Sequence, residues 1–278
     1  MRTCRTSDRF GGRYGNRRLR DGPRVRRAPR VRRRTPEFPR PAVGPQLAAS
    51  SRVGRIPRSV LVQLDSLNHC CWQTHNHERL FDEQGAREKF LELLGRHKAK
   101  HGILIHSYCL MGTHPHVLCT ATLGQEHFSA FWKVVNHGFA RWVNRRLRRR
   151  GQVVMERLGS PRIQPTAVHV LRVMRYQDRN PVEARLVRRA SHWRWSSHRH
   201  YALGIPDPII DPPDAYLALG RTGAQRRKAY RHLFHRPLED SIRREHRSAG
   251  DGLSWLPFIG DADWVERRHV DAGLDPPS

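Results

Sequence analysis

Residues 103–120 read ILIHSYCLMGTHPHVLCT, and this stretch decides the fold. Its first eight residues are mostly β-branched, aromatic or otherwise apolar, which is the composition of a strand. Residues 114–120 form a second such run, and only residues 111–113 separate the two. Because a connection this short joins antiparallel neighbours, the stretch predicts two paired strands and a tight turn.

The second of these strands begins with a His-x-His pair, His114 and His116. Successive side chains of a strand point to opposite faces, so both imidazoles of such a pair share one face. Two imidazoles on one face form a candidate metal site. In a chain with 18 histidines such a pair also arises by chance. Its value as evidence for a metal site therefore depends on which other side chains the fold places next to it.

A helix is predicted from residue 164, because Pro165 then stands at an early position where its missing N–H costs nothing. One side of this helix carries a polar stripe: His169, Arg172, Tyr176 and Asn180. The other side is expected to face the core: Val168, Leu171 and Met174. Pro181 disfavours helical geometry at the residue before it, so we expect a kink or a restart there.

The chemistry of these side chains suits cleavage of a phosphodiester. The hydroxyl of Tyr176 is a candidate nucleophile, and a divalent ion can stabilise charge on the phosphate oxygens. The imidazoles of His114 and His116, with the amide oxygen of Asn180, leave coordination places for water and phosphate, which suits Mg²⁺ or Mn²⁺. Zinc more often recruits a third His, Cys or carboxylate ligand.

Further elements alternate between strands and helices. Residues 60–64 predict a first strand, and residues 152–157 predict another. Asp82 is expected to cap a helix that ends near Gly102. Three apolar residues of that helix fall on one side: Phe90, Leu93 and Leu94. Strands flanked by helices in this mixed order indicate an α+β layer fold.

The net charge of the chain is +27, from 52 Lys and Arg against 25 Asp and Glu. A surface this basic attracts polyanions, so nucleic acid is the expected partner. In a proteome that is rich in arginine, a protein can carry the same excess of basic residues without any functional reason. Net charge alone therefore identifies no function.

A long helix is predicted by an aromatic and apolar stripe that is expected to face the core: Phe128, Phe131, Trp132, Val135, Phe139, Trp142 and Val143. A basic cluster follows, read either as phosphate-binding or as a solvated helix end: Arg145, Arg146, Arg148, Arg149 and Arg150. Arg172 and Arg179 are added as candidates for DNA contact.

Five cysteines, an odd number without a paired CxxC spacing, argue against a secreted disulfide framework. No apolar run approaches the roughly 20 residues that a membrane helix needs, and the basic N-terminus lacks the apolar core of a signal peptide. We therefore expect a cytoplasmic protein with no membrane partner.

Three segments of the chain are similar to the motifs of one known family. Residues 108–118, 176–187 and 195–198 read YCLMGTHPHVL, YQDRNPVEARLV and WSSH. In this order they resemble the motifs of the single-tyrosine HUH transposases, and most closely those of the REP-associated tyrosine transposases. Residues 214–219 and 230–234, DAYLAL and YRHLF, resemble the C-terminal extension of larger members. The resemblance covers roughly residues 57–235 and extends in weaker form to Trp264.

This resemblance implies a ferredoxin-like antiparallel sheet with helices on one face, and an enzyme that cleaves and rejoins single-stranded or hairpin DNA. By the same resemblance, Tyr176 attacks the phosphate and forms a 5′-phosphotyrosine link. His114, His116 and Asn180 hold Mg²⁺ or Mn²⁺. The implied partner is DNA with a hairpin or inverted repeat, bound by a monomer or a homodimer.

Three parts of the chain follow. Residues 1–55 hold 17 Arg, three acidic residues and six prolines, and predict a disordered basic arm, which either binds DNA or has no function. Residues 56–203 form the transposase-like catalytic domain, and residues 204–278 form a partly helical C-terminal extension.

The chain departs from the family pattern at Pro115, at Gly112-Thr113 and at Gln177. Pro115 removes a backbone donor, which suits an edge strand or a bulge better than a central strand. A second hypothesis is therefore a decayed or domesticated member that binds DNA hairpins without cutting them. A general RNA-binding protein is a third, without a module signature to support it.

A second ligand-rich patch, residues 69–71 and 75–77, reads His-Cys-Cys and His-Asn-His. Adjacent cysteines do not easily chelate one ion together, so a loop that packs or faces DNA is favoured over a zinc site.

Overall fold

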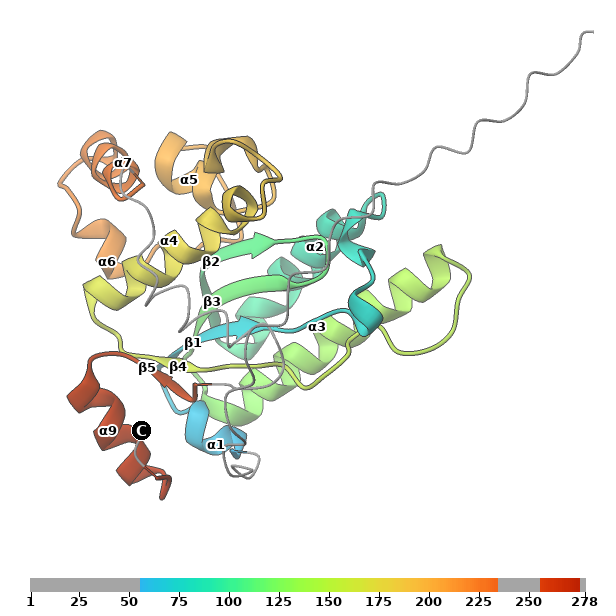
Figure 1. Ribbon diagram of the computed structural model, residues 1–278, viewed down its shortest axis with the longest axis horizontal. Coiled ribbons are helices and arrows are strands. Elements are labelled where there is room, and N and C mark those ends of the chain that lie inside the picture. The colour runs from blue at the N-terminus through green and yellow to red at the C-terminus, as the bar shows by residue number, and fades with distance from the viewer. Residues whose placement is uncertain (1–55, 235–255, 276–278) are drawn as a thin grey trace, which may run out of the picture. The chain divides into compact units, whose positions relative to one another are not determined.

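The fold is an α+β arrangement around one five-stranded sheet, seen in a computed structural model of the chain (Figure 1). The structure describes residues 56–234 and 256–275. Within them, the strand order is β2-β3-β1-β4-β5. The predicted α+β class is confirmed, whereas the arm predicted at residues 1–55 lies outside the described residues.

Three antiparallel strands form the centre of the sheet: β1 (Ser66–Cys71), β2 (Ile103–Leu110) and β3 (Pro115–Ala121). β2 and β3 are the hairpin predicted from the sequence. β1 pairs with the other side of β3, and its last residue, Cys71, lies opposite His116. Every residue of β1 is buried, because the sheet is covered on both faces.

Two very short strands extend the sheet beyond β1: β4 (Arg162–Ile163) and β5 (Phe258–Ile259). β4 pairs antiparallel with β1, where Arg162 lies opposite Asn68. β5 pairs with β4 in parallel. A segment from late in the chain thus extends a sheet that the earlier strands begin.

Helices cover both faces of this sheet: α2 (Ala86–Lys98) and α3 (Gly124–Arg146) on one, and α4 (Ala167–Glu183) on the other (Figure 1). On the first face, the ring of Trp72 contacts Phe90 of α2 and Phe139 of α3. On the second, Ser107 of β2 donates a hydrogen bond to Gln177 of α4. The expected placement of helices on one face is therefore corrected, because α4 buries an apolar side of its own.

The apolar stripes of α2 and α3 face the core, as the sequence predicted. The buried residues of α2 are Ala86, Phe90, Leu93 and Leu94. Those of α3 are Phe128, Phe131, Trp132, Val135, Phe139 and Val143. A Cβ at Gly138 of α3 would lie 3.0 Å from Leu93 of α2, so a glycine allows these two helices to approach closely.

The strand predicted at residues 60–64 is wrong. The chain forms the short helix α1 (Arg58–Leu61) there instead. Asp65, whose backbone is left-handed with a φ of 55°, then redirects the chain into β1. The true strand was hidden because polar side chains such as Asn68 and His69 interrupt its apolar pattern. Residues 152–157 also form no strand, and only Val154 makes an isolated bridge, to Thr74.

The ends of two helices differ from expectation. α2 begins after Gly85, whose left-handed backbone has a φ of 81°, while Asp82 belongs to a 3₁₀ turn (Leu80–Asp82) and pairs with Arg79 and Arg87. The predicted end near Gly102 is confirmed: a 3₁₀ turn (Ala99–His101) follows α2 directly, and Gly102 is left-handed.

α4 continues through Pro181 to Glu183 without a break. A proline this close to a helix C-terminus removes only one of the last hydrogen bonds, so its cost is small here. Thr166 caps the helix by accepting from the backbone N–H of His169. Val168, expected in the core, is 60% exposed, whereas Met174 is buried as predicted, together with Val170 and Val173.

The described residues after 197 form further helices: α5 (His198–Leu203), α6 (Asp214–Leu217), α7 (Gly223–His232) and α9 (Ala262–Asp271). One more 3₁₀ turn (Ala190–His192) precedes α5, and another (His75–His77) follows β1. The carboxylate of Asp211 accepts from the backbone N–H of Ile105 and from Lys98. These contacts cross the boundary expected between residues 203 and 204, so the extension packs on the strands and helices that precede it.

In the two described ranges, no helix has both the length and the apolar character to cross a membrane. The four cysteines described there are free thiols: Cys70, Cys71, Cys109 and Cys119.

Candidate active site

The fold brings His114 and His116 together at the start of β3. Their rings are perpendicular, with centroids 4.8 Å apart. His114 is the last residue of the turn, where its carbonyl oxygen accepts from the backbone N–H of Met111. The geometry is that expected of a His-x-His pair on one strand face.

Pro115, the residue between them, sits in a central strand without loss of a needed hydrogen bond. It is the first residue of β3 and lies opposite Leu110, the last residue of β2. The N–H of Leu110 donates to Trp195 instead, and β1 ends at Cys71, opposite His116. Because no neighbouring strand needs an N–H at this position, proline is tolerated there.

Tyr176 of α4 lies next to this pair, although it follows it by sixty residues in the chain. Its ring centroid is 5.7 Å from that of His116, at an angle of 83°. Asn180 lies one turn later, and its Nδ2 donates a hydrogen bond to the backbone oxygen of Tyr176 at 3.1 Å. The structure thus places the candidate nucleophile beside the imidazoles, while the amide nitrogen of Asn180 faces its own helix.

His69 of β1 is a third imidazole of this cluster, although the sequence assigned it to a separate ligand-rich patch. It is fully buried, and its Nε2 lies 3.1 Å from Nδ1 of His116. Its ring is stacked on that of His116 at 5.2 Å and meets the ring of Tyr176 edge-on at 6.0 Å. The signal that could have identified it is the register of β1, which the misplaced first strand concealed.

Two imidazoles of this cluster, those of His69 and His114, are held in their neutral form. Burial lowers the pKa of His69 to about 3, and the nearby His114 lowers it further. Burial also lowers the pKa of His114 to about 4, with a second contribution from His77. A neutral imidazole keeps one nitrogen lone pair, which is the form that binds a metal ion.

α4 is fixed on both sides of Tyr176 by buried hydrogen bonds. Ser107 of β2 donates to Oε1 of Gln177 at 2.6 Å. Asp178, fully buried, lies 3.0 Å from Nδ1 of His198 through its Oδ2 and accepts from the hydroxyl of Tyr230 at 2.7 Å. These bonds set the rotation of α4 and therefore the direction of Tyr176.

The WSSH motif at residues 195–198 supports the same arrangement. The carbonyl oxygen of Trp195 accepts from Leu110, and the N–H of Ser197 donates to Tyr108. The motif therefore covers the open edge of β2 and places His198 next to Asp178. Its part in the site is to hold α4 against the sheet.

The donor set fits a divalent ion in its chemistry. His114 and His116 offer two imidazoles on one face, and Asn180 offers an amide oxygen one turn from Tyr176. Nδ1 of His114 is bonded to the hydroxyl of Thr113, which leaves Nε2 for a ligand. In the described part of the chain, no three His, Cys, Asp or Glu side chains converge in a metal-binding arrangement.

The second ligand-rich patch does not form around Cys70. Its Sγ lies 3.6 Å from Sγ of Cys119 in the core, and burial raises the pKa of this thiol well above its ordinary value. Cys70 and His69 point to opposite faces of β1, as neighbouring residues of a strand must. Residues 75–77 form a 3₁₀ turn in the loop that leads to α2.

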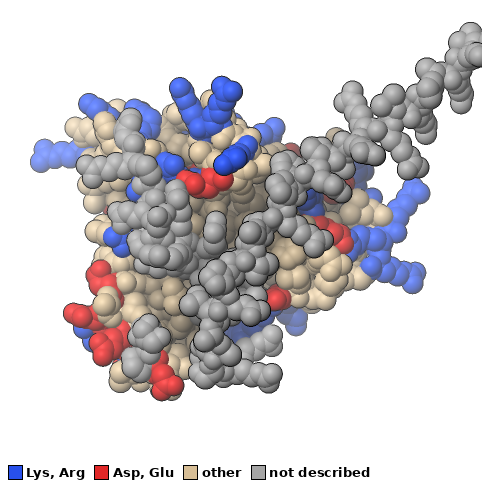
Figure 2. Space-filling view, viewed as in Figure 1, with Lys and Arg blue, Asp and Glu red and all other residues tan. Residues whose placement is uncertain are grey.

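The candidate DNA-binding arginines fall into two groups. At the end of α3, Arg149 pairs with Glu78 and Arg146 with Gln84, whereas three arginines are exposed and have no ion pair among the described residues: Arg145, Arg148 and Arg150. On α4, Arg172 is half-buried and Arg179 pairs with Glu183. Figure 2 shows the first group as a basic end on the right of the view, with acidic residues of α9 at the lower left.

No family model matches this chain, and no curated protein matches it either. Among solved structures, the chain is similar to one described as a REP-associated tyrosine transposase bound to a REP hairpin. The two are 19% identical with a TM-score of 0.43, over 54% of this chain and 86% of that one.

Proposed function

We propose that the protein cleaves and rejoins single-stranded or hairpin DNA through a covalent link to Tyr176. The observation that supports this is the position of the Tyr176 ring, 5.7 Å from His116, which itself lies 4.8 Å from His114. A nucleophile beside two imidazoles that can hold a divalent ion is an arrangement that supports phosphodiester transfer by a tyrosine.

The reaction conserves the energy of the bond that it breaks. The hydroxyl oxygen of Tyr176 forms a bond to phosphorus, and the bond from phosphorus to the 3′ oxygen breaks. The proton lost by the tyrosine is balanced by the proton that the leaving 3′ oxygen gains. A 3′ hydroxyl then attacks the 5′-phosphotyrosine and rejoins a strand, so no nucleotide cofactor is consumed.

His114, His116 and Asn180 are the residues that would hold a divalent ion, Mg²⁺ or Mn²⁺. When bound, such an ion supplies Lewis-acid stabilisation of charge on the phosphate oxygens. The protein's own residues orient the site: His69 holds the ring of His116 through Nδ1, and α4 holds Tyr176. The natural setting that we propose is cytoplasmic, for a monomer or a homodimer.

The test is formation of a covalent adduct. Purified protein with Mn²⁺ is incubated with labelled hairpin DNA that carries candidate target sequences, and adducts are resolved on a denaturing gel. Wild type is expected to form an adduct, and Tyr176→Phe none. Tyr216→Phe is the matched control, because it removes a hydroxyl that bonds only to Tyr201 in α5. An adduct of equal yield with Tyr176→Phe refutes the mechanism.

A second candidate function is hairpin binding without cleavage. The observation that favours it is the hydrogen bond from Nδ2 of Asn180 to its own helix, which holds this side chain at the backbone. Tight hairpin binding with no adduct in Mg²⁺, Mn²⁺ or Zn²⁺ supports this function. An adduct that disappears when EDTA is added, while hairpin binding persists, supports cleavage.

A further inference from the structure

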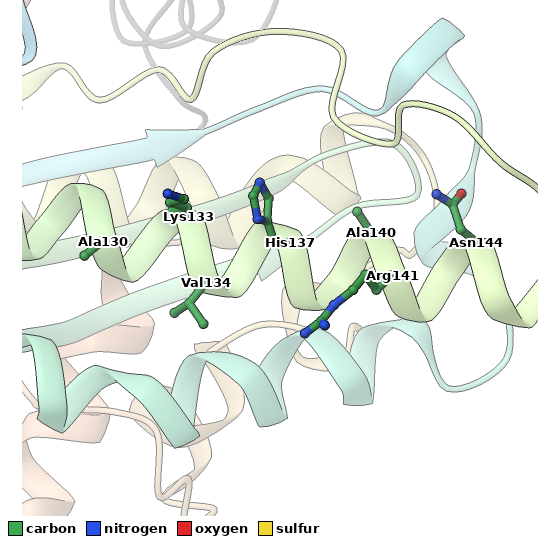
Figure 3. A pocket seen from close by; sticks show the side chains of 7 residues that line it. All are labelled: Ala130, Lys133, Val134, His137, Ala140, Arg141 and Asn144. Carbon is green, nitrogen blue, oxygen red and sulfur yellow. The ribbon is translucent and has the colours of Figure 1, made fainter.

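α3 carries a row of basic side chains on the side that faces away from the sheet. Its members stand four residues apart: Lys133, His137, Arg141 and Arg145. We call these four residues the α3 row. Residues four apart on a helix are surface neighbours, with Cβ atoms about 5–6 Å apart, so the row is continuous over three turns. Figure 3 shows its first three members projecting from α3 beside a groove of about 500 Å³.

The row has no counter-charge of its own. All four side chains are exposed, and none has an ion pair or a hydrogen-bond partner among the described residues. The only acidic residue of α3 is Glu126, in its first turn. On α2, by contrast, Lys89 and Arg96 both pair with Glu92.

This arrangement does not stabilise the helix. Like charges at i and i+4, such as Arg141 and Arg145, repel each other along a helix. The charge of Arg145 is offset by the helix dipole at the C-terminal end, but Lys133 and Arg141 lie too far from that end to benefit. A row that opposes folding requires a reason outside the fold, and an anionic ligand supplies one.

The shape of the row indicates which anion. It winds gradually around α3, by about 40° at each step of four residues, and it spans about 18 Å at the 1.5 Å rise of a helix. Single strands are bound by aromatic side chains on which bases stack. The aromatic residues of α3 face the core instead: Phe128, Phe131, Trp132 and Phe139 are buried. A winding row of basic side chains without stacking rings suits the regularly spaced phosphates of a duplex, whose backbone also winds around its axis.

We propose that the α3 row binds the sugar-phosphate backbone of double-stranded DNA. This inference rests on the proposed function only in taking DNA as the ligand. α3 covers the face of the sheet opposite to α4, so a duplex on the α3 row leaves Tyr176 accessible to a single strand. The protein therefore has separate surfaces for duplex and for scissile strand.

The test compares two variants that lose the same charge. The triple variant Lys133→Gln, Arg141→Gln, Arg145→Gln removes the row. The control Arg221→Gln, Lys228→Gln, Arg267→Gln removes three exposed basic residues of α7, its N-terminal loop and α9, whose side chains likewise form no hydrogen bond or ion pair in the described part of the chain. Glutamine is a good helix former, so both variants are expected to fold, which circular dichroism checks.

Fluorescence anisotropy with a labelled 25-base-pair duplex then gives Kd as a function of salt. The row variant is expected to bind at least tenfold more weakly, with a salt slope smaller by about three, since each phosphate contact contributes about 0.9. The control is expected to stay within twofold of wild type, as is Arg141→Lys with Arg145→Lys, which keeps the charges.

Equal weakening of both triple variants overturns the proposal, because net charge alone then explains binding. An unchanged Kd in the row variant overturns it as well, and so does preferential binding of an RNA duplex. Failure of wild type to form any adduct counts against the proposed cleavage only, since duplex binding is measured without cleavage.

Discussion

Nε2 of His69 lies 3.1 Å from Nδ1 of His116, so the tautomer of His69 determines which nitrogen of His116 is available to a ligand. If the neutral His69 accepts at Nε2, Nδ1 of His116 carries the hydrogen and its Nε2 has the lone pair. Removing His69 should therefore weaken metal binding although His69 is no ligand. His69→Ala is expected to lower Mn²⁺ affinity about 10–100-fold, measured by electron paramagnetic resonance.

The same measurement of Mn²⁺ affinity distinguishes a loss of orientation of the His116 ring from a general loss of structure. His69→Gln offers an amide oxygen as acceptor and is expected to retain more affinity than His69→Ala. His192→Ala, at an exposed position, serves as the control for loss of any histidine. If His69→Ala binds Mn²⁺ as tightly as wild type, His69 does not orient His116 for metal binding.

Asp178 should be among the residues most sensitive to substitution. Its buried carboxylate joins His198 and Tyr230, so Asp178→Ala leaves both without their partner. Breaking a buried charged network by removing one member costs about 3–5 kcal/mol. Tyr230→Phe removes a single hydrogen bond to a charged group and should cost about 1.5–3 kcal/mol. Urea unfolding followed by fluorescence measures both, and a cost for Asp178→Ala below that of Tyr230→Phe contradicts the network.

Gly102 and Gly124 provide a matched pair for separating backbone strain from crowding. Both are left-handed, with φ of 59° and 75°. A Cβ at Gly102 would lie 2.5 Å from Cγ of Leu123, whereas a Cβ at Gly124 meets nothing within 4 Å. Gly124→Ala should cost about 1–2 kcal/mol from the backbone alone. Gly102→Ala should cost about 1–3 kcal/mol more from overpacking, as read from unfolding midpoints. Equal costs would mean that Leu123 moves aside freely.

Acid should destabilise the protein in part through His106. Its Nδ1 is 2.8 Å from the carbonyl oxygen of Asp211 and must donate, so its Nε2 accepts from the hydroxyl of Thr120. Burial lowers the pKa of His106, although the bond to Asp211 partly opposes this. The unfolded chain therefore binds a proton first as pH falls, so the contribution of His106 is present above about pH 6.5 and lost below it.

The measurement is the urea midpoint between pH 7.5 and pH 5. Wild type is expected to lose stability across this range, and His106→Gln to lose less. His192→Gln, at an exposed site, is expected to follow wild type. A pH dependence that is the same in His106→Gln as in wild type assigns the loss to other groups.

The parts of the fold that follow from sequence are those with a strong local pattern. The β2–β3 hairpin has two apolar runs and one short turn, and α3 has an apolar stripe at helical spacing. Both were predicted. β1 was misplaced because its side chains are buried on both faces, so polar residues such as Asn68 and His69 occur within it and no alternation marks it.

For the candidate site, sequence identified the residues but not their partners. The spacing of Tyr176 and Asn180 on one helix face was visible, whereas the bond of Nδ2 of Asn180 to its own backbone was not. His69 could not be found from spacing, because its place beside His116 depends on the register between β1 and β3. Neighbours set by strand register are visible only in three dimensions.

The parallel pairing of β5 with β4 bears on how the protein is made. Ribosomes synthesise β4 long before β5, so the β4 edge stays unpaired while the intervening chain emerges. An unpaired strand edge is a template for aggregation, and here it is only two residues long. Shortness of β4 thus protects the nascent chain during the interval before Phe258 and Ile259 arrive.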